Sequence, residues 1–523
     1  MWIRGSNLFV YLLIPPLKTV SKGCKMKVLL VYPKYPRTFW SFKYALRFTL
    51  VKKATHPPLA LLTVASMLPE DWEKKLIDMN VSSLKDKDIR WADLVFISAI
   101  SIQRESVRKV IDRCKKIGVK IVAGGPLFTS SFNKFDDVDY LVLNEAELTL
   151  SPFLKDLESG RAKHIYTTKK WADIKKTPIP MWKLVDMKKY VSMNIQYSRG
   201  CPFNCEFCDI PILYGYRPRT KDAKQVIEEL ESLYQHGWRE AVFFVDDNFI
   251  GNKERLKREI LPAITLWMEE RRRPFTFITQ ASLDLSDDEA LMRLMVQAGF
   301  DTVFVGIETP SEEGLSECNK FPNKNRNLIR SIKKIQRFGL QVQGGFIVGF
   351  DSDQPSIFER QIDFIQKSGI ATAMVSLLYA FRGTRLYKRM EGENRLVDNR
   401  SNSGHSSDEY TDCSTNIIPK MQYNTLIDGY KRIVKTIYSP DHYYERVRRF
   451  LKDYKLFQRI GRFRFSYLFA FFNSILILGF LSKERIRYWK LFFETLFNRP
   501  RLFPLAISFT LCGFHFRKVF ERL

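Results

Sequence analysis

Residues 197–210 read YSRGCPFNCEFCDI, and the three cysteines of this stretch, Cys201, Cys205 and Cys208, follow a C-x3-C-x2-C spacing. Residues 193–197 (MNIQY) come shortly before them and are predicted to form a strand. The cysteines therefore belong to a loop at the carboxyl end of a strand, which is where α/β folds place their chemistry. This loop is the strongest chemical signal in the chain.

Three thiolates on one loop favour an iron–sulfur cluster. Thiolates are soft ligands, and three of them can bind three irons of a cubane while the fourth iron stays open to a bidentate ligand. Zinc is the alternative, but a structural zinc site usually closes with four ligands. No fourth Cys or His lies nearby, since His164 and His236 are distant in sequence. We therefore predict a 4Fe-4S cluster held by the three cysteines.

Strand and helix candidates alternate on both sides of this loop. Strands are predicted at residues 193–197, 241–246, 275–280, 302–306, 341–349 and 371–378, and helices at residues 223–235, 253–270, 287–298, 325–337 and 355–367. Six successive βα units predict a partial (β/α)6 barrel over residues 191–390, with its chemistry at the carboxyl ends of the strands.

A second alternating series precedes the barrel. Strands are predicted at residues 27–33, 75–78, 94–98, 120–124 and 140–143, with helices such as residues 58–67 and 106–117 between them. This pattern predicts a doubly wound α/β domain over residues 26–160, joined to the barrel by a linker at residues 161–190. Ligands of such sheets bind beyond the strand ends, where Gly124, Gly125 and residues 144–147 would lie.

The two ends of the chain are predicted to differ from this core. Residues 1–25 hold a short apolar run broken by Pro15 and Pro16, so we expect a leader or an over-extended start before Met26. Residues 391–420 are polar and predict a loop, and residues 421–523 predict a basic, apolar helical extension. Within it, residues 465–481 carry no charge and have basic flanks. Either an interfacial helical hairpin on anionic lipid or a helix pair packed on the barrel fits this pattern.

Net charge and cysteine usage indicate which classes of partner and which cellular compartment to expect. The formal net charge is +27, and from Lys431 onward 20 Lys and Arg stand against 6 Asp and Glu. This balance attracts anionic lipid, nucleic acid or a polyphosphate cofactor. Only eight cysteines occur, and those outside the loop are scattered singly, which indicates a reducing compartment and not a disulfide framework. We expect a cytoplasmic protein, with peripheral contact at the inner face of the membrane as an option that the basic charge leaves open.

The cysteine spacing, with Phe207 before the last cysteine, resembles the radical S-adenosylmethionine (SAM) superfamily. The resemblance implies that the cluster binds SAM and cleaves it to a radical that abstracts hydrogen from an unactivated carbon, with no catalytic residues beyond the cluster ligands. Other segments resemble the SAM-contacting strands of that superfamily, and they supply the predicted cofactor-binding residues Asp246, Asp247, Gln280, Ser282, Glu308, Gly345 and Val348.

The N-terminal half resembles the cobalamin-binding domain of one large subgroup, through the segments VLLVYP, HPPLALLTVASML, IVAGGPLFT and NEAEL. This resemblance implies that Gly124 and Gly125 contact cobalamin. The Asp-x-His-x-x-Gly motif, whose histidine binds cobalt from below in many such domains, is absent before Gly125. Either cobalamin binds without that ligand or the domain is a vestigial scaffold.

Within this subgroup the chain is similar to the hopanoid C-2 methylase group, which shares the cysteine loop almost as written and carries a helical extension. The resemblance implies methyl transfer through methylcobalamin to a lipid or other hydrophobic substrate, with a reducing partner such as ferredoxin or flavodoxin. A tRNA-modifying radical SAM enzyme is the alternative, although the chain shows no small RNA-binding β-barrel, so nucleic acid is not the expected partner. A membrane-attached iron–sulfur electron carrier or sensor is the alternative from another class.

Overall fold

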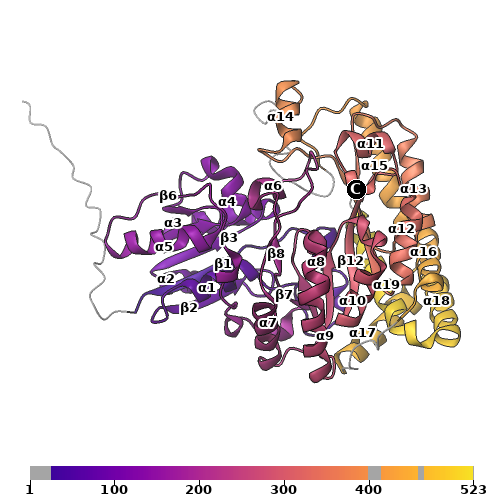
Figure 1. Ribbon diagram of the computed structural model, residues 1–523, viewed down its shortest axis with the longest axis horizontal. Helices are drawn as coiled ribbons and strands as arrows, with labels where there is room; N and C mark the ends of the chain where they lie inside the picture. Colours follow the sequence, from indigo (N-terminus) through magenta and orange to yellow (C-terminus); the bar gives the residue numbers. More distant parts are fainter. Residues whose placement is uncertain (1–24, 398–413, 457–464, 522–523) are drawn as a thin grey trace, which may run out of the picture.

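The computed structural model describes residues 25–397, 414–456 and 465–521, and it contains two parallel sheets side by side (Figure 1). The predicted leader lies outside these residues. The N-terminal sheet has the order β2-β1-β3-β4-β5-β6. Its strands are β1 (Lys27–Tyr32), β2 (Glu73–Asp78), β3 (Leu94–Ser98), β4 (Lys120–Gly124), β5 (Tyr140–Val142) and β6 (Ile165–Tyr166), and its helices are α1 (Leu59–Met67), α2 (Asp86–Trp91), α3 (Arg104–Ile117), α4 (Pro126–Ser131) and α5 (Ala146–Glu158). The predicted doubly wound fold is confirmed.

The second sheet has the order β14-β13-β12-β11-β10-β7, with every pair parallel and no pairing between β14 and β7. The predicted six-stranded partial barrel is therefore confirmed. Its strands are β7 (Ser192–Ile195), β10 (Ala241–Phe244), β11 (Thr276–Gln280), β12 (Phe300–Glu308), β13 (Gln341–Val348) and β14 (Ala373–Leu377). The helices around it are α7 (Ala223–Gln235), α8 (Lys253–Arg255), α9 (Leu261–Glu270), α10 (Glu289–Ala298), α11 (Glu312–Glu317), α12 (Leu328–Arg337), α13 (Ile357–Ser368) and α14 (Arg385–Gly392).

Alternation along the barrel strands separates the core from the lumen. On β7, Met193 and Ile195 belong to the hydrophobic core shared with the surrounding helices, while Asn194 lines a cavity on the opposite face. On β14, Val375 belongs to that core and Met374 lines the cavity. Because successive side chains of a strand point to opposite faces, the helices cover one side of the sheet and the other side encloses the lumen.

A small hairpin, absent from the sequence prediction, brackets the cysteine loop. Strand β8 (Ser198–Arg199) pairs antiparallel with β9 (Arg219–Thr220), and the short helix α6 (Ile210–Tyr214) lies between them. Strands of two residues carry no recognisable period in the sequence. This pair of strands, β8 and β9, closes the ends of the cysteine loop and so defines where the cluster ligands lie.

Residues 33–58, called the strap below, leave β1 and cover the open side of the barrel. Trp40 donates its indole N–H to the Met374 sulfur at 2.7 Å and contacts the edge of Phe304. Further along, Ala54 pairs in parallel with Tyr190, directly before β7. The strap therefore contacts residues of both β14 and the approach to β7, between which the sheet is open.

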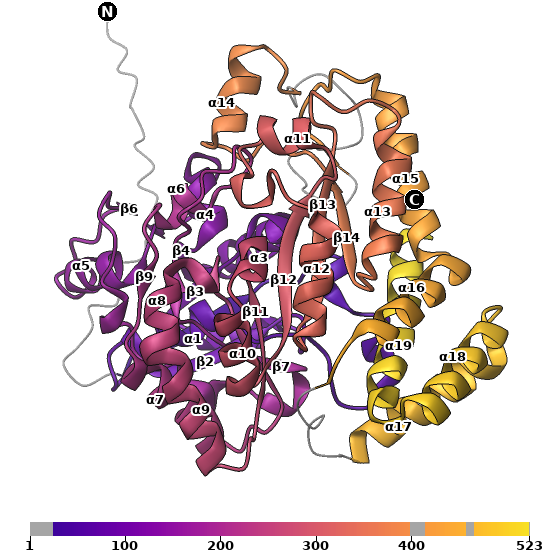
Figure 2. The ribbon, with the colours of Figure 1, turned by 45° about the vertical axis from the view of Figure 1, so that its right-hand side comes forward.

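The C-terminal extension packs against the barrel and the strap (Figure 2). It consists of α15 (Tyr423–Tyr438), α16 (Pro440–Asp453), α17 (Phe465–Ser474), the π-helix Ile475–Leu481, α18 (Arg485–Asn498) and α19 (Phe503–Phe520). Phe516 of α19 stacks on Phe39 of the strap with ring centres 4.2 Å apart. None of the described helices is both long and apolar enough to cross a bilayer.

His515 of α19 is fully buried, and it holds the strap through both ring nitrogens. Its Nε2 donates to the Phe39 carbonyl at 2.9 Å, and its Nδ1 accepts from the Tyr44 N–H at 3.3 Å. This pattern fits the neutral ring, since a proton on Nδ1 would face the Tyr44 N–H. Burial is the main cause that lowers the pKa of His515 from 6.5 to about 4.

Acidification should therefore loosen the contact between the extension and the strap. The unfolded chain protonates this imidazole near pH 6.5, while the folded protein keeps it neutral down to about 4, so the unfolded state gains protons as the pH falls. Lowering the pH from about 7 to about 5 should cost about 2 kcal/mol through His515. Urea unfolding at both pH values measures this loss, and His515→Gln should reduce it. An equal pH dependence in His515→Gln would contradict the assignment.

Candidate active site

The three cysteines lie half-buried on the loop between β8 and β9, at the carboxyl end of β7. Burial raises the pKa of all three thiols, and the nearby Lys320 ammonium opposes this rise at Cys205. Backbone hydrogen bonds fix the middle of the loop, because the Glu206 N–H donates to the Cys318 carbonyl at 2.9 Å. The loop is thus anchored at its middle, and its thiols lie close enough to raise one another's pKa.

Two aspartates from the end of β10 hold the entry to this loop. Asp246 is fully buried and accepts hydrogen bonds from the Tyr197 N–H at 3.2 Å and from both the N–H and the hydroxyl of Ser198. Asp247 accepts from the Gly200 N–H at 2.9 Å and lines the cavity. Burial raises their pKa values, to about 7 for Asp246 and about 6 for Asp247. The carboxylates predicted to contact SAM therefore also position the cysteine loop.

The other predicted SAM-binding residues lie at the same ends of the strands but in different surroundings. Gln280 lines the cavity, whereas Ser282 is buried and bonded to Asn248, 3.2 Å from its amide nitrogen. Glu308 adopts a left-handed backbone conformation (φ 67°) and forms an ion pair with Lys320 at 2.6 Å. Such a conformation is uncommon for a non-glycine residue.

Strand β13 turns its two predicted residues to opposite faces. Gly345 lies against the Phe304 ring, where an added Cβ would stand 2.8 Å from a ring carbon. Val348 is fully buried in the core on the helix side. Phe207 packs against a separate buried cluster that contains Cys318 and Met390. The roles of these residues in binding SAM stay predictions.

Gly124 and Gly125 form a narrow turn at the end of β4 and line the cavity. A Cβ on Gly124 would meet the Val142 carbonyl oxygen at 2.6 Å, and one on Gly125 would meet the Ser98 hydroxyl at 2.7 Å. Gly125 also has a φ of 92°, which disfavours other residues. Glycine is therefore required at both positions because the protein's own atoms pack against the turn, and the turn forms part of the cavity wall.

One cavity of about 830 Å³ joins the N-terminal sheet to the barrel lumen. On one side Gly124 and Gly125 line it, and on the other Gln280 and Met374. The strap contributes His56, whose Nδ1 lies 2.7 Å from the Ser192 hydroxyl and whose pKa is lowered by burial to about 4. The cavity thus brings the predicted cobalamin turn and part of the predicted SAM set to one enclosed space.

Ion pairs fasten the cysteine hairpin to the N-terminal domain. Arg199 of β8 pairs with Glu145 at 3.0 Å and with Glu147 at 2.8 Å, and Arg219 of β9 pairs with Glu145 at 2.8 Å. The Glu145 side chain is almost wholly buried. Both glutamates belong to the segment after β5 that sequence reasoning marked as a ligand edge, but neither was predicted to pair across the domains. The cluster loop is therefore tied to the domain that carries the glycine turn.

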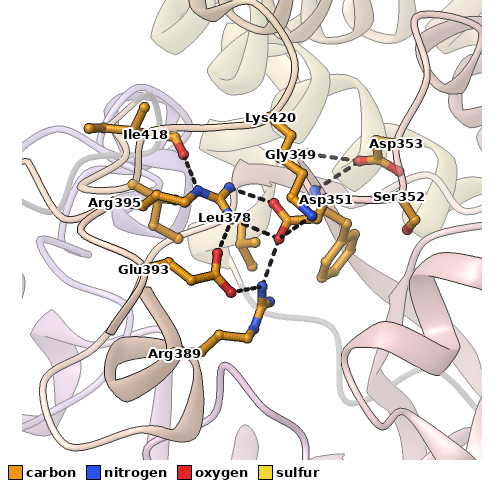
Figure 3. A network of polar contacts seen from close by, with 12 residues as sticks. Gly349, Asp351, Ser352, Asp353, Leu378, Arg389, Glu393, Arg395, Ile418 and Lys420 are labelled. Atoms are coloured by element: carbon orange, nitrogen blue, oxygen red, sulfur yellow. Dashed lines mark hydrogen bonds and ion pairs between the residues drawn. The ribbon is translucent and has the colours of Figure 1, made fainter. Parts of the chain in front are cut away.

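A second ion network holds the other side of the cysteine loop, and Figure 3 shows the part of it around Asp351. Arg389 of α14 binds Glu206, between two of the cysteines, at 2.7 and 3.0 Å, and Asp351 at 2.7 Å. Arg395 binds the same Asp351 at 2.5 and 2.8 Å. Burial would raise the pKa of Asp351, but the hydrogen bonds from Arg395 and Arg389 outweigh it and lower that pKa to about 2. Sequence reasoning missed this network, because isolated charges in a helix and a loop form no recognisable motif.

Removal of Arg389 should therefore destabilise the loop that is predicted to bind the cluster. In Arg389→Met the Glu206 and Asp351 carboxylates lose a shared cation, and we expect a loss of about 2 kcal/mol in stability. Iron content after gel filtration of the reconstituted protein should fall with it. Arg395→Met is the matched control, since it takes a cation from Asp351 without touching Glu206 and should keep the iron. Full iron retention in Arg389→Met would contradict this role.

The resemblance implies a 4Fe-4S cluster and cobalamin, and the side chains at the two sites fit these groups. The three thiols suit the three separate irons of a cubane, and the glycine turn lines a cavity of about 830 Å³ that could hold a large ligand. Among the described residues, no three His, Cys, Asp or Glu side chains are grouped around a single metal position. The residues present fit a cluster in the loop and cobalamin beside the N-terminal sheet.

Three family models match successive parts of the chain. A B12 binding domain matches residues 49–154, the radical SAM superfamily matches residues 195–365, and a domain of unknown function, DUF4070, matches residues 384–523. An uncharacterised methyltransferase of Synechocystis sp. is 38% identical over 93% of this chain and 90% of its own length. The hopanoid C-2 methylase of Rhodopseudomonas palustris is 33% identical over 74% of each chain.

Solved structures share the fold of the two sheets. The cobalamin-dependent SAM radical enzyme OxsB with aqua-cobalamin bound has a TM-score of 0.60 at 14% identity, over 95% of this chain and 81% of its own. The radical SAM methyltransferase TsrM of Kitasatospora setae, with cobalamin and a [4Fe-4S] cluster bound, has a TM-score of 0.56 at 16% identity, over 77% of this chain and 84% of its own.

Proposed function

Because this chain belongs to the cobalamin-dependent radical SAM methyltransferases, we propose that it methylates an unactivated carbon of a membrane lipid such as a hopanoid. The family carries a 4Fe-4S cluster, SAM and cobalamin, so cobalamin is retained and the domain is not a vestigial scaffold. Membership of an enzyme family also displaces the electron-carrier alternative.

The shared cavity is the observation that supports this proposal most directly. It extends from the glycine turn of the N-terminal domain to Gln280 and Asp247 in the barrel, so a methyl carrier and a hydrogen-abstracting group could reach one substrate. Apolar side chains such as Trp40, Met374 and Phe381 line it beside these polar groups. Such a lining favours a hydrophobic substrate held by a few hydrogen bonds.

The side chains of the chain have distinct tasks in this proposal. The bound cluster, SAM and cobalamin supply the one-electron and methyl-transfer chemistry. Cys201, Cys205 and Cys208 would hold the cluster, and Asp246 fixes the entry to their loop. Trp40 closes the open side of the barrel, which would keep water from the reacting groups.

The proposed reaction implies a protein that supplies electrons and contact with a membrane. The enzyme needs a reductant for its cluster, for which a ferredoxin or flavodoxin is the expected kind of protein. We place it in the cytoplasm, at the inner face of the membrane, because a hopanoid substrate resides in a bilayer. The tRNA alternative has no specific observation in its favour, and the similarity to the hopanoid C-2 methylase favours lipid.

The substrate proposal is tested with anaerobically reconstituted enzyme, a chemical reductant and SAM carrying a trideuterated methyl group. A desmethyl hopanoid, a sterol and bulk tRNA are offered separately, and each is recovered for mass spectrometry. We expect label in the hopanoid alone, and none with Cys205→Ala. Label in tRNA or in neither lipid, while SAM is still cleaved, would overturn the substrate and leave the enzyme class standing.

A further inference from the structure

Residues 465–501, called the hairpin below, expose an unusual amount of apolar surface. Nine of the 25 large hydrophobic side chains that are exposed in the described part of the chain lie between Phe469 and Phe497. The most exposed are Leu481, Ile486 and Phe497, at 74%, 73% and 75%. Exposed apolar patches of this kind mark binding surfaces on proteins.

Seven of these nine exposed residues form one stripe on each of two neighbouring helices. On α17 and the following π-helix they recur at positions 469, 472, 476 and 480, and on α18 at positions 486, 493 and 497. These spacings of three, four and seven keep them on one helical face. The opposite faces hold buried residues such as Leu478, Tyr488 and Leu491, which pack into the main core. The hairpin is thus packed on the protein by one side and bare on the other.

Aromatic contacts join the two stripes into one surface. Trp489 donates its indole N–H to the Gly479 carbonyl at 2.9 Å, and its ring contacts Phe480 and stacks on Phe493. A Cβ on Gly479 would stand 3.0 Å from the Trp489 ring, so glycine permits this close approach. Figures 1 and 2 show α18 at the edge of the molecule, on the far side of the barrel from the N-terminal sheet.

The charges of the hairpin identify the chemistry of its partner. It carries six Lys and Arg against two Glu. Both glutamates are engaged outside the hairpin, Glu484 by Arg517 and Glu494 by Arg448. Lys483, Arg485 and Lys490 are exposed beside the apolar stripe. An apolar face rimmed by cations complements a bilayer with anionic headgroups.

The hairpin also lies next to the strap. Asn473 donates to the Phe48 carbonyl at 3.2 Å, and the strap residues Leu50 and Val51 are exposed beside this contact. Trp40 and Lys43 of the same strap line the cavity, and Trp40 is partly exposed. The apolar surface therefore continues from the hairpin toward the part of the cavity that the strap covers.

We propose that the hairpin is a monolayer docking surface that lies on anionic lipid and brings the strap side of the barrel to the bilayer. This inference deepens the proposed function, because a membrane lipid must reach the cavity, but it does not depend on which lipid is methylated. The apolar stripe would enter the headgroup boundary, and the basic rim would face anionic headgroups. None of the described helices needs to cross the bilayer for this mode of binding.

Vesicle sedimentation of the full-length holoenzyme tests the inference. The vesicles contain phosphatidylcholine alone or equal parts phosphatidylcholine and phosphatidylglycerol. The apolar variant combines Phe472→Ser, Leu481→Ser, Ile486→Ser and Phe497→Ser, and the charge variant combines Lys483→Gln, Arg485→Gln and Lys490→Gln. The matched control, Leu266→Ser with Phe132→Ser, removes exposed apolar side chains elsewhere. Thermal unfolding checks that all variants fold.

The wild type and the control should sediment with the anionic vesicles, and less so at high salt. The apolar variant should lose at least about tenfold in affinity, and the charge variant roughly fivefold for each cation removed. Equal binding by the apolar variant, or no binding by the wild type, would overturn the proposal. A concentration-dependent dimer that the apolar variant abolishes would assign the surface to a second copy instead. Vesicle binding without hopanoid methylation would leave the docking surface intact and reject only the substrate.

Discussion

Asp246→Asn is expected to abolish most SAM cleavage, although it changes no residue predicted to bind iron. Asp246 is fully buried, and its two oxygens accept from the Tyr197 N–H and from the N–H and hydroxyl of Ser198, three residues before Cys201. An asparagine of the same shape would place an N–H₂ group against one of these donors. The loop must then shift, and a displacement of about 1 Å at a reacting centre can cost about 100-fold in rate.

The measurement is 5′-deoxyadenosine release by reconstituted protein at a pH above 7, with iron content read on the same sample. Asp301→Asn is the control, because Asp301 is another carboxyl whose pKa is raised by desolvation, to about 6, but it is only partly buried and lies at the start of β12, away from the loop. We expect it to lose stability and to keep SAM cleavage. Normal cleavage by Asp246→Asn would show that the carboxylate does not position the loop.

Gly125→Val is expected to separate methyl transfer from SAM cleavage. Its Cβ would stand 2.7 Å from the Ser98 hydroxyl, at the edge of the cavity, and the positive φ of Gly125 adds strain. The clash would displace the turn that is predicted to contact cobalamin, so bound cobalamin and methyl transfer should fall by about 100-fold or more, a difference of about 3 kcal/mol. The cysteine loop lies on the other side of the cavity from Gly125, so the variant should continue to cleave SAM.

Gly118→Val provides the control for backbone strain. Gly118 ends α3 of the same domain with a φ of 82°, and nothing lies within 4 Å of the Cβ that it would gain. Gly118→Val should lose about 1–2 kcal/mol of stability from the left-handed conformation, and Gly125→Val should lose more, because its Cβ also meets Ser98. Only Gly125→Val should lose cobalamin, as read from its visible absorption after gel filtration. Cobalamin retained by Gly125→Val would contradict the site at the glycine turn.

Sequence periodicity predicted both sheets, because buried parallel strands are apolar runs separated by helices. Each of the predicted strands is found in the structure, with ends that differ by a few residues. The short strands β6, β8 and β9 were missed, since two residues carry no period. The strap was also missed, because residues 33–58 have no regular pattern and their position depends on contacts with α19, far along the chain.

The sequence predicted residues of the candidate site only where they belong to a recognisable local motif. The cysteine spacing and the strand-end acids are local patterns, whereas Arg389 and Lys320 lie near the loop although they belong to distant segments. Single charges are usually solvated, so nothing in the sequence distinguishes these two. For residues 465–481 the structure shows one face packed on the core, and contact of the other, exposed face with lipid stays a prediction.

The most direct test of the enzyme class and its cofactors is anaerobic purification and cluster reconstitution from Met26 onward, followed by reduction in the presence of SAM. The 5′-deoxyadenosine formed and the cobalamin bound are measured on one sample, beside Cys205→Ala. We predict cobalamin in both proteins and 5′-deoxyadenosine only where all three cysteines are intact. Neither cluster nor 5′-deoxyadenosine in the wild type, or equal release by Cys205→Ala, would contradict the account.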